Sequence, residues 1–507
     1  MSFCFKRRAF GRGGFKFLGL VAAVAIIAFS LVVLVPLLQT ARETAAFGDD
    51  ATNLKLQERA TTMSSTTVPT AGPLRIHPAN PRYFADSAGN PVYMTGSHTW
   101  DNLVRVNGPS GESMDFDAYL DFMVSHGHNF MRGWSREGRG WIHEPIVHRF
   151  ERTGPGTAND DKPKFDLTRL NPEYFDTIRS RVIAAGKRGI YVSVMLFDAS
   201  GWNEQRVSTI HPFHRNNNIN GIDADPTNEG KGRDIVTLAD PRVVAIQESV
   251  ARKIVDTVND LDNVVYEIIN EAPEYSTEFQ YHMIRFIREY EKSKPKQHLI
   301  GMTSNGGAPP DDRARLFNSQ ADWISPGHDS SFPAYMDDPP ATLGDKVIVL
   351  DTDHIWGVGG DRQWVWKSFL RGYNPIYMDP YKDKDRRATL SVAEDVFERA
   401  RKAMGHTLMY ARKMNLASMK PNNWLSSTSY CLADPGKEYL VYQPKSGAFK
   451  LMFGPGTFQC EWFNPDTGTA VPGEVVSTKG EEKSFSPPFE GDAVLYLKAA
   501  SGETSGK

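Results

Sequence analysis

The stretch Asn263-Val-Val-Tyr-Glu-Ile-Ile-Asn-Glu-Ala-Pro-Glu274 decides the fold class. Residues Val264 to Ile269 are apolar and largely β-branched, interrupted by Glu267, which predicts a strand buried in a parallel sheet. The run ends at Asn270-Glu271, and Pro273 prevents its extension. An amide and a carboxylate at the tip of a buried strand are costly unless they are used. Two interpretations stay open: a polar strand end that caps the next helix, or part of a site at the rim of a (β/α)8 barrel.

The same pattern recurs along the chain from Pro91. Short apolar runs with polar tips alternate with segments of helical periodicity, which predicts a parallel sheet with right-handed crossovers. The runs are Val92–Gly96, Asn129–Gly133, Ile190–Phe197, Val264–Ile269, His298–Thr303, Trp323–Ser325, Lys346–Leu350 and Asn374–Met378. Eight such units over about 290 residues match the size of an α/β fold of the (β/α)8 TIM barrel type. A doubly wound open sheet is the alternative, but no Gly-rich phosphate loop follows the first run.

The helical periodicity is strongest in six segments. They are Phe116–Ser125, Pro172–Arg188, Pro241–Val258, Thr277–Lys292, Asp361–Arg371 and Ser391–Lys413. The last opens with Ser391-Val-Ala-Glu394, which predicts a capping box. Two connections, Ser135–Leu170 and Ala199–Asp240, are long and rich in Trp, His, Asn and Gly, and we expect them to wall a groove at the rim.

We place the barrel domain at residues 73–420, with further segments before and after it. Residues 43–72 lack periodicity and predict a linker. Arg75 to Asn90 predicts a hairpin with Ala88-Gly89-Asn90 as its turn. Residues 421–500 predict a small antiparallel β-sandwich. Its expected strands are Tyr439–Tyr442, Phe449–Phe453, Gln459–Phe463, Glu474–Ser477 and Ala493–Leu497.

The first 42 residues predict a membrane anchor. Five basic residues precede an uncharged run from Phe17 to Ala41, which exceeds the ~20 residues that cross a bilayer, and residues 17–38 would contact the lipid. The positive flank stays cytoplasmic, so the folded part faces the periplasm or the outside of the cell. We favour an uncleaved single-pass anchor, with secretion after signal cleavage as the alternative. Cys431 and Cys460 would then be either a disulfide or two buried thiols.

The composition indicates which classes of binding partner are improbable on physical grounds. A formal net charge of -3 and the lack of a basic face beyond the N-terminus argue against nucleic acid. The sequence implies no cofactor, and its histidine and aspartate spacings do not make a convincing metal site. The oligomeric state stays open.

Polar and aromatic side chains gather at the predicted strand tips, which meet at one rim of the barrel. They are His98, Trp100, Arg132, Trp134, Asp198, Asn270, Glu271, His328, Asp353, His354, Trp356 and Asp379. Indole faces stack on the apolar faces of sugars, and carboxylates or amides bind hydroxyls. The rim therefore predicts a carbohydrate substrate.

Glycoside hydrolysis needs two carboxyl groups on either side of the bond that breaks. The fourth and seventh strands lie across a barrel from each other, so Glu271 and Asp353 form a sensible pair. We interpret Asp351 as a salt-bridged strand residue and Glu267 as an ion-pair partner inside the barrel. His354 either orients Asp353 or caps a helix.

An Asn270-Glu271 tip on strand four with an acidic tip on strand seven resembles clan A of the glycoside hydrolases. The resemblance implies that Glu271 is the acid/base, that Asn270 binds a 2-hydroxyl, and that the strand-seven carboxylate, here Asp353, is the nucleophile of a retaining reaction. It also matches Arg132 to a supporting arginine and His328 to a substrate-binding histidine.

A closer resemblance is to the apiosidase-like family. It lies in the opening Arg75–Tyr93, and in the tail segments Glu461–Gly468 and Ser486–Pro488, which resemble a β-sandwich module commonly labelled collagen-binding. The resemblance covers roughly Arg75 to Lys498 and implies a plant or microbial polysaccharide or oligosaccharide as substrate.

The sequence departs from the clan at strand seven, where Asp replaces Glu. The shorter side chain changes the carboxyl separation, and about 5–5.5 Å gives retention whereas roughly 6.5–9.5 Å gives inversion. The departure also keeps open a non-catalytic carbohydrate- or matrix-binding protein on a glycosidase-like barrel. A protease is disfavoured, because no Ser/His/Asp or zinc signature occurs.

Overall fold

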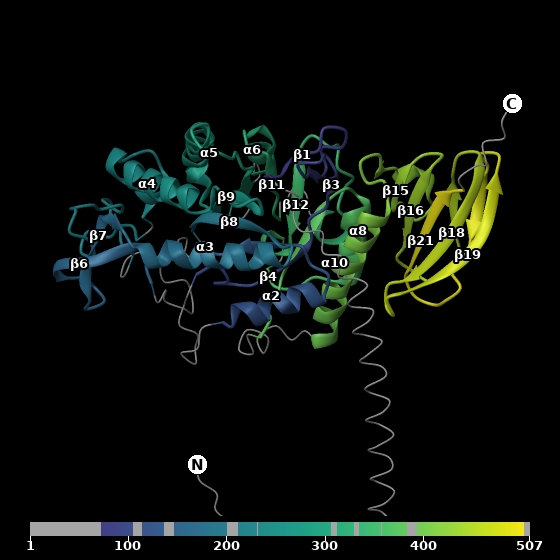
Figure 1. The fold of residues 1–507 in the computed structure, drawn as a ribbon, viewed down its shortest axis with the longest axis horizontal. Helices are drawn as coiled ribbons and strands as arrows, with labels where there is room; N and C mark the ends of the chain where they lie inside the picture. Colours follow the sequence, from purple (N-terminus) through teal and green to yellow (C-terminus); the bar gives the residue numbers. More distant parts are fainter. Residues whose placement is uncertain are drawn as a thin grey trace, which may run out of the picture. The chain divides into compact units, whose positions relative to one another are not determined.

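Eight parallel strands form the central sheet, in the order β4-β13-β12-β11-β10-β9-β8-β5. They are β4 (Gly96–His98), β5 (Phe130–Gly133), β8 (Tyr191–Asp198), β9 (Val264–Asn270), β10 (Ile300–Thr303), β11 (Trp323–Ser325), β12 (Val347–Asp351) and β13 (Asn374–Met378). Figure 1 labels β4, β8, β9, β11 and β12 among them. The two end strands approach closely, since a Cβ added at Gly96 would lie 2.2 Å from the Phe130 carbonyl oxygen, and Asn129 N donates to Thr95 O at 3.1 Å. The sheet therefore closes into the predicted (β/α)8 TIM barrel.

The computed structural model describes residues 72–104, 114–135, 147–199, 211–230, 232–305, 312–328, 334–355, 357–382 and 393–500. Within these ranges no helix combines the length and the apolar character that crossing a bilayer requires. The predicted membrane span, residues 17–38, lies outside them, as does the predicted linker up to residue 71.

Helices follow the strands near the predicted positions. They are α2 (Phe116–Ser125), α3 (Pro172–Lys187), α4 (Pro241–Val258), α5 (Thr277–Glu291), α6 (Asp312–Asn318), α7 (Ala334–Asp337), α8 (Arg362–Leu370) and α10 (Glu394–Lys413). Four of them begin where a side-chain oxygen accepts from a first-turn backbone N–H, which satisfies a donor that the helix leaves unpaired. These N-caps are Asp115, Asn171, Asp240 and Asp361.

The predicted capping box of the last helix includes Ser391, which lies outside the described residues. Helix α10 begins at Glu394, and its N-cap is Ala393, which makes no side-chain cap. The Glu394 carboxylate accepts from Arg401 Nη1 at 2.7 Å, which gives it an ion pair within its own helix. The capping box itself stays a prediction.

Apolar side chains fill the barrel at the N-terminal ends of its strands. The predicted hairpin becomes a three-stranded antiparallel sheet of β1 (Arg75–Ile76), β2 (Phe84–Ala85) and β3 (Pro91–Val92). Phe84 belongs to one buried cluster with side chains from the starts of the barrel strands, including Phe130, Val265 and Trp323. A Cβ added at Gly301 would lie 1.9 Å from the Trp323 ring, so the indole fills the space that this glycine leaves.

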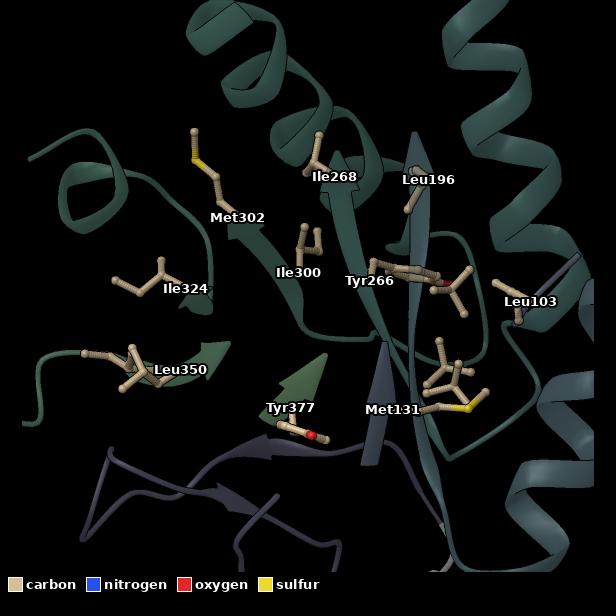
Figure 2. Packing of buried hydrophobic residues seen from close by; sticks show 14 of the residues in the cluster. Leu103, Met131, Leu196, Tyr266, Ile268, Ile300, Met302, Ile324, Leu350 and Tyr377 are labelled. Atoms are coloured by element: carbon tan, nitrogen blue, oxygen red, sulfur yellow. The ribbon is translucent and has the colours of Figure 1, made fainter. Parts of the chain in front are cut away.

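The outer face of the barrel is also apolar. Figure 2 shows Ile268, Met302 and Ile324 on the neighbouring strands β9, β10 and β11. They belong to a large buried cluster that includes Ile284 of α5 and Leu316 of α6. Burial on both faces explains why these strands are near-continuous apolar runs in the sequence.

The two long strand-to-helix connections pack against each other. The first contains an antiparallel hairpin of β6 (Phe150–Thr157) and β7 (Pro163–Leu170). Phe165 N donates to Asn217 O at 2.8 Å, and Ile219 N donates to Phe165 O at 2.9 Å. That they form the walls of a groove stays a prediction.

The C-terminal strands form antiparallel sheets, as predicted. A six-stranded sheet contains β14 (Lys420–Pro421), β15 (Cys431–Asp434), β16 (Glu438–Gln443), β21 (Ala493–Ala499), β18 (Gly456–Asn464) and β19 (Thr469–Thr478), and a smaller one contains β17 (Phe449–Met452) and β20 (Glu482–Phe485). The larger sheet packs on α8, where Trp366 stacks on Tyr442 at 6.0 Å and Arg362 donates to Asp492 at 2.7 Å.

Both C-terminal cysteines are buried free thiols. Cys431 lies on β15 and Cys460 on β18, with β16 and β21 between them. Three inter-strand spacings place the two roughly 14 Å apart, beyond the reach of a disulfide. The sheet order thereby decides an alternative that the sequence leaves open.

Candidate active site

A fully buried guanidinium, that of Arg132 on β5, lies at the centre of the charged groups inside the barrel. Its Nε donates to Glu267 on β9 at 2.9 Å, and its Nη1 donates to Asp351 at 2.8 Å and to Asp353 at 3.1 Å. Burial alone would lower the pKa of Arg132, but the charges of Glu267 and Asp351 outweigh it and hold the pKa well above the usual value. One cation therefore joins the second, fourth and seventh strands across the barrel.

Asp351 is the structural carboxylate of the seventh strand, as the sequence predicts. Its Oδ1 accepts from His98 Nε2 at 3.0 Å and from the Asp353 backbone N–H at 3.0 Å, and its Oδ2 accepts from Arg132. Burial alone would raise the pKa of Asp351, but His98 and Arg132 outweigh it and hold the pKa below its usual range. With both oxygens engaged and the side chain fully buried, Asp351 is ionised and not available to a substrate.

The proton on His98 can be placed from its partners. Trp134 Nε1 lies 3.0 Å from His98 Nδ1, and an indole nitrogen only donates. Nδ1 is therefore the acceptor, and the ring proton lies on Nε2, where it points to Asp351. The predicted substrate-binding pair His98 and Trp134 thus orients the buried carboxylate.

Asp353 is the partly accessible carboxylate of the network. It lies in the short 3-10 turn η4 (Thr352–His354) that follows β12, its side chain is 8% exposed, and its Oδ2 accepts from Arg132. Burial, and next the charge of Asp351, raise the pKa of Asp353 to about 6. Of the two strand-seven carboxylates, Asp353 is therefore both the one that a ligand can reach and the one whose pKa is raised.

His354 and Asn270 connect the seventh strand to the fourth. Asn270 Oδ1 accepts from Arg132 Nη2 at 2.7 Å and lies 3.3 Å from His354 Nε2, while Asn270 Nδ2 donates to Asp198 at 3.3 Å. Because the amide oxygen accepts, His354 donates from Nε2, and its Nδ1 accepts from Ser325 Oγ at 3.0 Å. Burial, with the Arg132 charge, lowers the pKa of His354 to about 3, so the ring is neutral. His354 thus holds Asn270, while its Nε2 lies 4.0 Å from Asp353 Oδ2, so the predicted orientation of Asp353 stays a prediction.

Glu271 follows Asn270 directly and has a backbone φ of +46°. A residue with a Cβ pays about 1–2 kcal/mol for this left-handed conformation. The half-buried Glu271 thus turns sharply away from the strand direction at the rim. Asp101 after β4 and Tyr381 after β13 share the conformation, with φ of +59° and +49°. Such strain commonly marks functional sites.

The rim tryptophans differ in exposure. Trp134 is buried in a small cluster with Met195 and Met378, and the Arg132 guanidinium lies 5.4 Å from the centre of its ring. Trp100 packs against that cluster but is only partly buried. Trp356 lies outside the described residues.

Two predicted site residues stand apart from this network. Both oxygens of the fully buried Asp379 accept from Arg401, at 2.7 and 2.8 Å, which gives this carboxylate a structural ion pair. The His328 side chain is exposed, and its backbone N–H donates to His354 O at 2.7 Å.

Asn102 and Ser325 belong to the site and were not singled out in the sequence. Asn102 Nδ2 donates to Arg132 O at 2.7 Å, and its Oδ1 accepts from Trp134 N at 2.8 Å, so it fixes the tip of β5. Ser325, the last residue of β11, bonds His354. Both residues are polar and lie at or just after the end of a strand, and this position is the feature of the sequence that could have identified them.

Asp351, Asp353 and His354 offer three possible metal-ligand atoms within 4.8 Å of one another. However, Arg132 Nη1 donates to both carboxylates, so a positive charge already lies where a cation would bind. The donor set fits an ion-pair network better than a metal site.

Comparisons with known proteins bear on the fold. No protein-family model matches the chain, and no curated protein matches its sequence. A solved glycoside hydrolase family 5 structure from Bacteroides vulgatus is similar at TM-score 0.60 and 14% identity, over 87% of this chain and 96% of its own.

Two further solved structures are similar in the same way. One, described as a glycoside hydrolase, has a TM-score of 0.55 and 10% identity over 87% of this chain and all of its own. Another from Bacteroides vulgatus has a TM-score of 0.56 and 13% identity over 86% of this chain and 83% of its own. These likenesses confirm the (β/α)8 fold.

Replacing Arg132 by Met should destabilise the protein by about 3–5 kcal/mol, because it leaves buried carboxylates without their cation. The free energy of unfolding in urea at pH 7 measures this. Arg179→Met is the matched control, since Arg179 pairs with Asp260 at the surface with side chains 37% and 60% exposed, and it should cost under about 1 kcal/mol. Equal losses in the two variants would contradict the central role of Arg132.

Proposed function

We propose that the protein is a glycoside hydrolase that cleaves O-glycosidic bonds in a plant or microbial polysaccharide or oligosaccharide by a two-carboxylate mechanism. Glu271 is the acid/base, and Asp353 is the nucleophile or the base that activates water. The likeness to solved glycoside hydrolases supports the proposal at the level of the fold, and the site geometry carries the rest.

The observation that carries the proposal is the link between the two strand tips. Arg132 donates to Asp353 after β12 and to Asn270 at the end of β9, the residue before Glu271. A single rigid, buried group thus fixes two carboxylate-bearing segments relative to each other, as chemistry on a bond held between them requires.

The two carboxyl groups have environments suited to different tasks. Asp353 keeps one hydrogen bond to Arg132 and some exposure, so it can reach an anomeric carbon or a water. Glu271 lies on a sharp turn at the rim, where it can protonate the leaving oxygen. Attack by Asp353 itself gives retention, which we favour, and activation of water gives inversion.

Asn270, His98, Trp100, Trp134 and Asp198 would shape the sugar site. His98, Trp134 and Asp198 act through the residues that they orient, whereas the partly exposed Trp100 offers a ring face. A non-catalytic carbohydrate-binding protein is the second candidate, and the shorter Asp at strand seven is the feature that favours it.

We also propose that residues 17–38 anchor the chain in a bilayer with the barrel on the periplasmic or extracellular side. The basic residues before the apolar run and the run's length support this. Secretion after cleavage is the alternative.

Glu271→Gln should reduce hydrolysis by about 10²–10⁴-fold, because it removes the proton donor while keeping the side-chain shape. Reducing ends released from a panel of plant and microbial polysaccharides measure the rate. Glu274→Gln, three residues along and exposed, is the matched control and should keep full activity. Equal hydrolysis by the Glu271→Gln variant and the unchanged protein would sink the enzymatic proposal, and binding without hydrolysis in both would favour the second candidate.

The rate should fall on the acid side with a midpoint near pH 6. Asp353 must be ionised to act, and burial and Asp351 raise its pKa to about 6, so activity is present above that pH and decreases roughly tenfold per unit below it. The pH profile of kcat/KM measures this. Asp351→Asn should move the midpoint to lower pH by removing the neighbouring negative charge, whereas an unchanged midpoint would contradict this assignment of Asp353.

Deleting residues 1–42 should move the protein from the membrane fraction to the soluble fraction when a tagged gene is expressed in a bacterial host. Fractionation with immunoblotting measures the distribution, and the mass of the intact chain separates anchoring from cleavage. A full-length chain of unreduced mass in the soluble fraction would refute both forms of the localisation proposal.

A further inference from the structure

One tryptophan of the C-terminal sheets is exposed to an extent that packing does not explain. Trp424 lies in the 3-10 turn η5 (Asn423–Leu425) between β14 and β15, and it is 73% exposed. An indole can bury 150–250 Å² of surface, so leaving most of this ring in water forgoes a large stabilisation. The next residue, Leu425, is buried in the core of the sheets, so the turn itself is well packed.

Hydrogen bonds fix the backbone on both sides of Trp424. Asn422 N donates to Cys431 O at 2.7 Å, and Leu425 N donates to Asn422 O at 3.0 Å. Farther along, Ser427 N donates to Lys450 O at 2.9 Å, and Lys450 N donates to Ser427 Oγ at 2.9 Å. The turn is thus tied to β15 and β17, and the indole stands on a preorganised base.

Apart from the buried Leu425, the residues near Trp424 in the sequence are polar. Asn423, just before the ring, is partly buried; its Oδ1 is buried from solvent and accepts no hydrogen bond from any described residue. Ser427 and Ser429 lie farther along the same segment. A flat, exposed indole on a fixed turn offers the surface on which the C–H face of a sugar stacks, and the exposed Ser427 and Ser429 are polar residues of the same segment.

We propose that Trp424 forms a second, non-catalytic carbohydrate site that stacks one sugar ring of a polysaccharide. This goes beyond the proposed function, because the site lies on the C-terminal sheets and does not depend on Glu271 or Asp353. It would hold the chain on an insoluble polymer. A protein partner is disfavoured, since a stable interface needs about 1,000 Å² or more and the exposed residues that follow in the segment, Ser427 and Ser429, are polar.

The test uses the full-length chain with Glu271→Gln, so that no substrate is consumed. Retention on cellulose, xylan, mannan, β-1,3-glucan and arabinan is measured by depletion. Retention on at least one polymer is expected, and Trp424→Ala should weaken it by about tenfold, whereas Trp424→Phe should keep most of it. Thermal unfolding should be unchanged in Trp424→Ala, because the ring is exposed.

Leu343→Ala is the matched control, since Leu343 is an apolar side chain on the barrel that is 80% exposed, and it should bind like the parent. The proposal is overturned if the parent binds none of the polymers, if Trp424→Ala binds like the parent, or if Leu343→Ala loses as much. It is also overturned if Trp424→Ala instead weakens binding to phosphatidylcholine–phosphatidylglycerol vesicles. Hydrolysis by the chain with Glu271 intact is measured separately, so that the two proposals fail independently.

Discussion

The buried cation of Arg132 is the constraint on which the upper half of the barrel depends. Glu267, Asp351 and Asp353 bring negative charge into a space with little water, and a single guanidinium donates to all three. Removing a charge from water costs several kcal/mol, and only close, well-aligned partners repay it. The strand tips therefore hold the positions that this cation allows.

The barrel interior divides into two layers with different tasks. At the N-terminal ends of the strands, Phe84, Phe130 and Trp323 provide apolar packing. Above them lie the ion pairs of Arg132, and above those the strained turn at Glu271. The apolar layer packs the starts of the strands, whereas the rim carries groups such as Asp353, whose pKa is raised by burial.

The eight strands were predictable because each is buried on both faces, so its residues form a short apolar run regardless of what lies around it. Asp351 and Glu267 were also predictable as ion-pair partners, because a carboxylate within such a run requires a cation. The start of the last helix was predicted less well: it was expected at Ser391, whereas α10 begins at Glu394, whose carboxylate pairs with Arg401 two turns along. In the sequence, Asp379 follows a strand as the other polar site residues do. Only the packing of α10 against the barrel shows that Arg401 pairs with the Asp379 carboxylate.

By itself, the sequence determined the barrel strands, the main helices between them, their order and the chemical types at the rim, because these follow from local patterns of apolar and polar residues. It did not show the β6–β7 hairpin, which lies in a segment predicted to be a long connection. Only the tertiary structure decided which polar tips act together. The tautomers of His98 and His354, the division of labour between Asp351 and Asp353, and the separation of Cys431 from Cys460 depend on strands far apart in the chain. Such pairings are set by closure of the barrel and by sheet order, which no local pattern encodes.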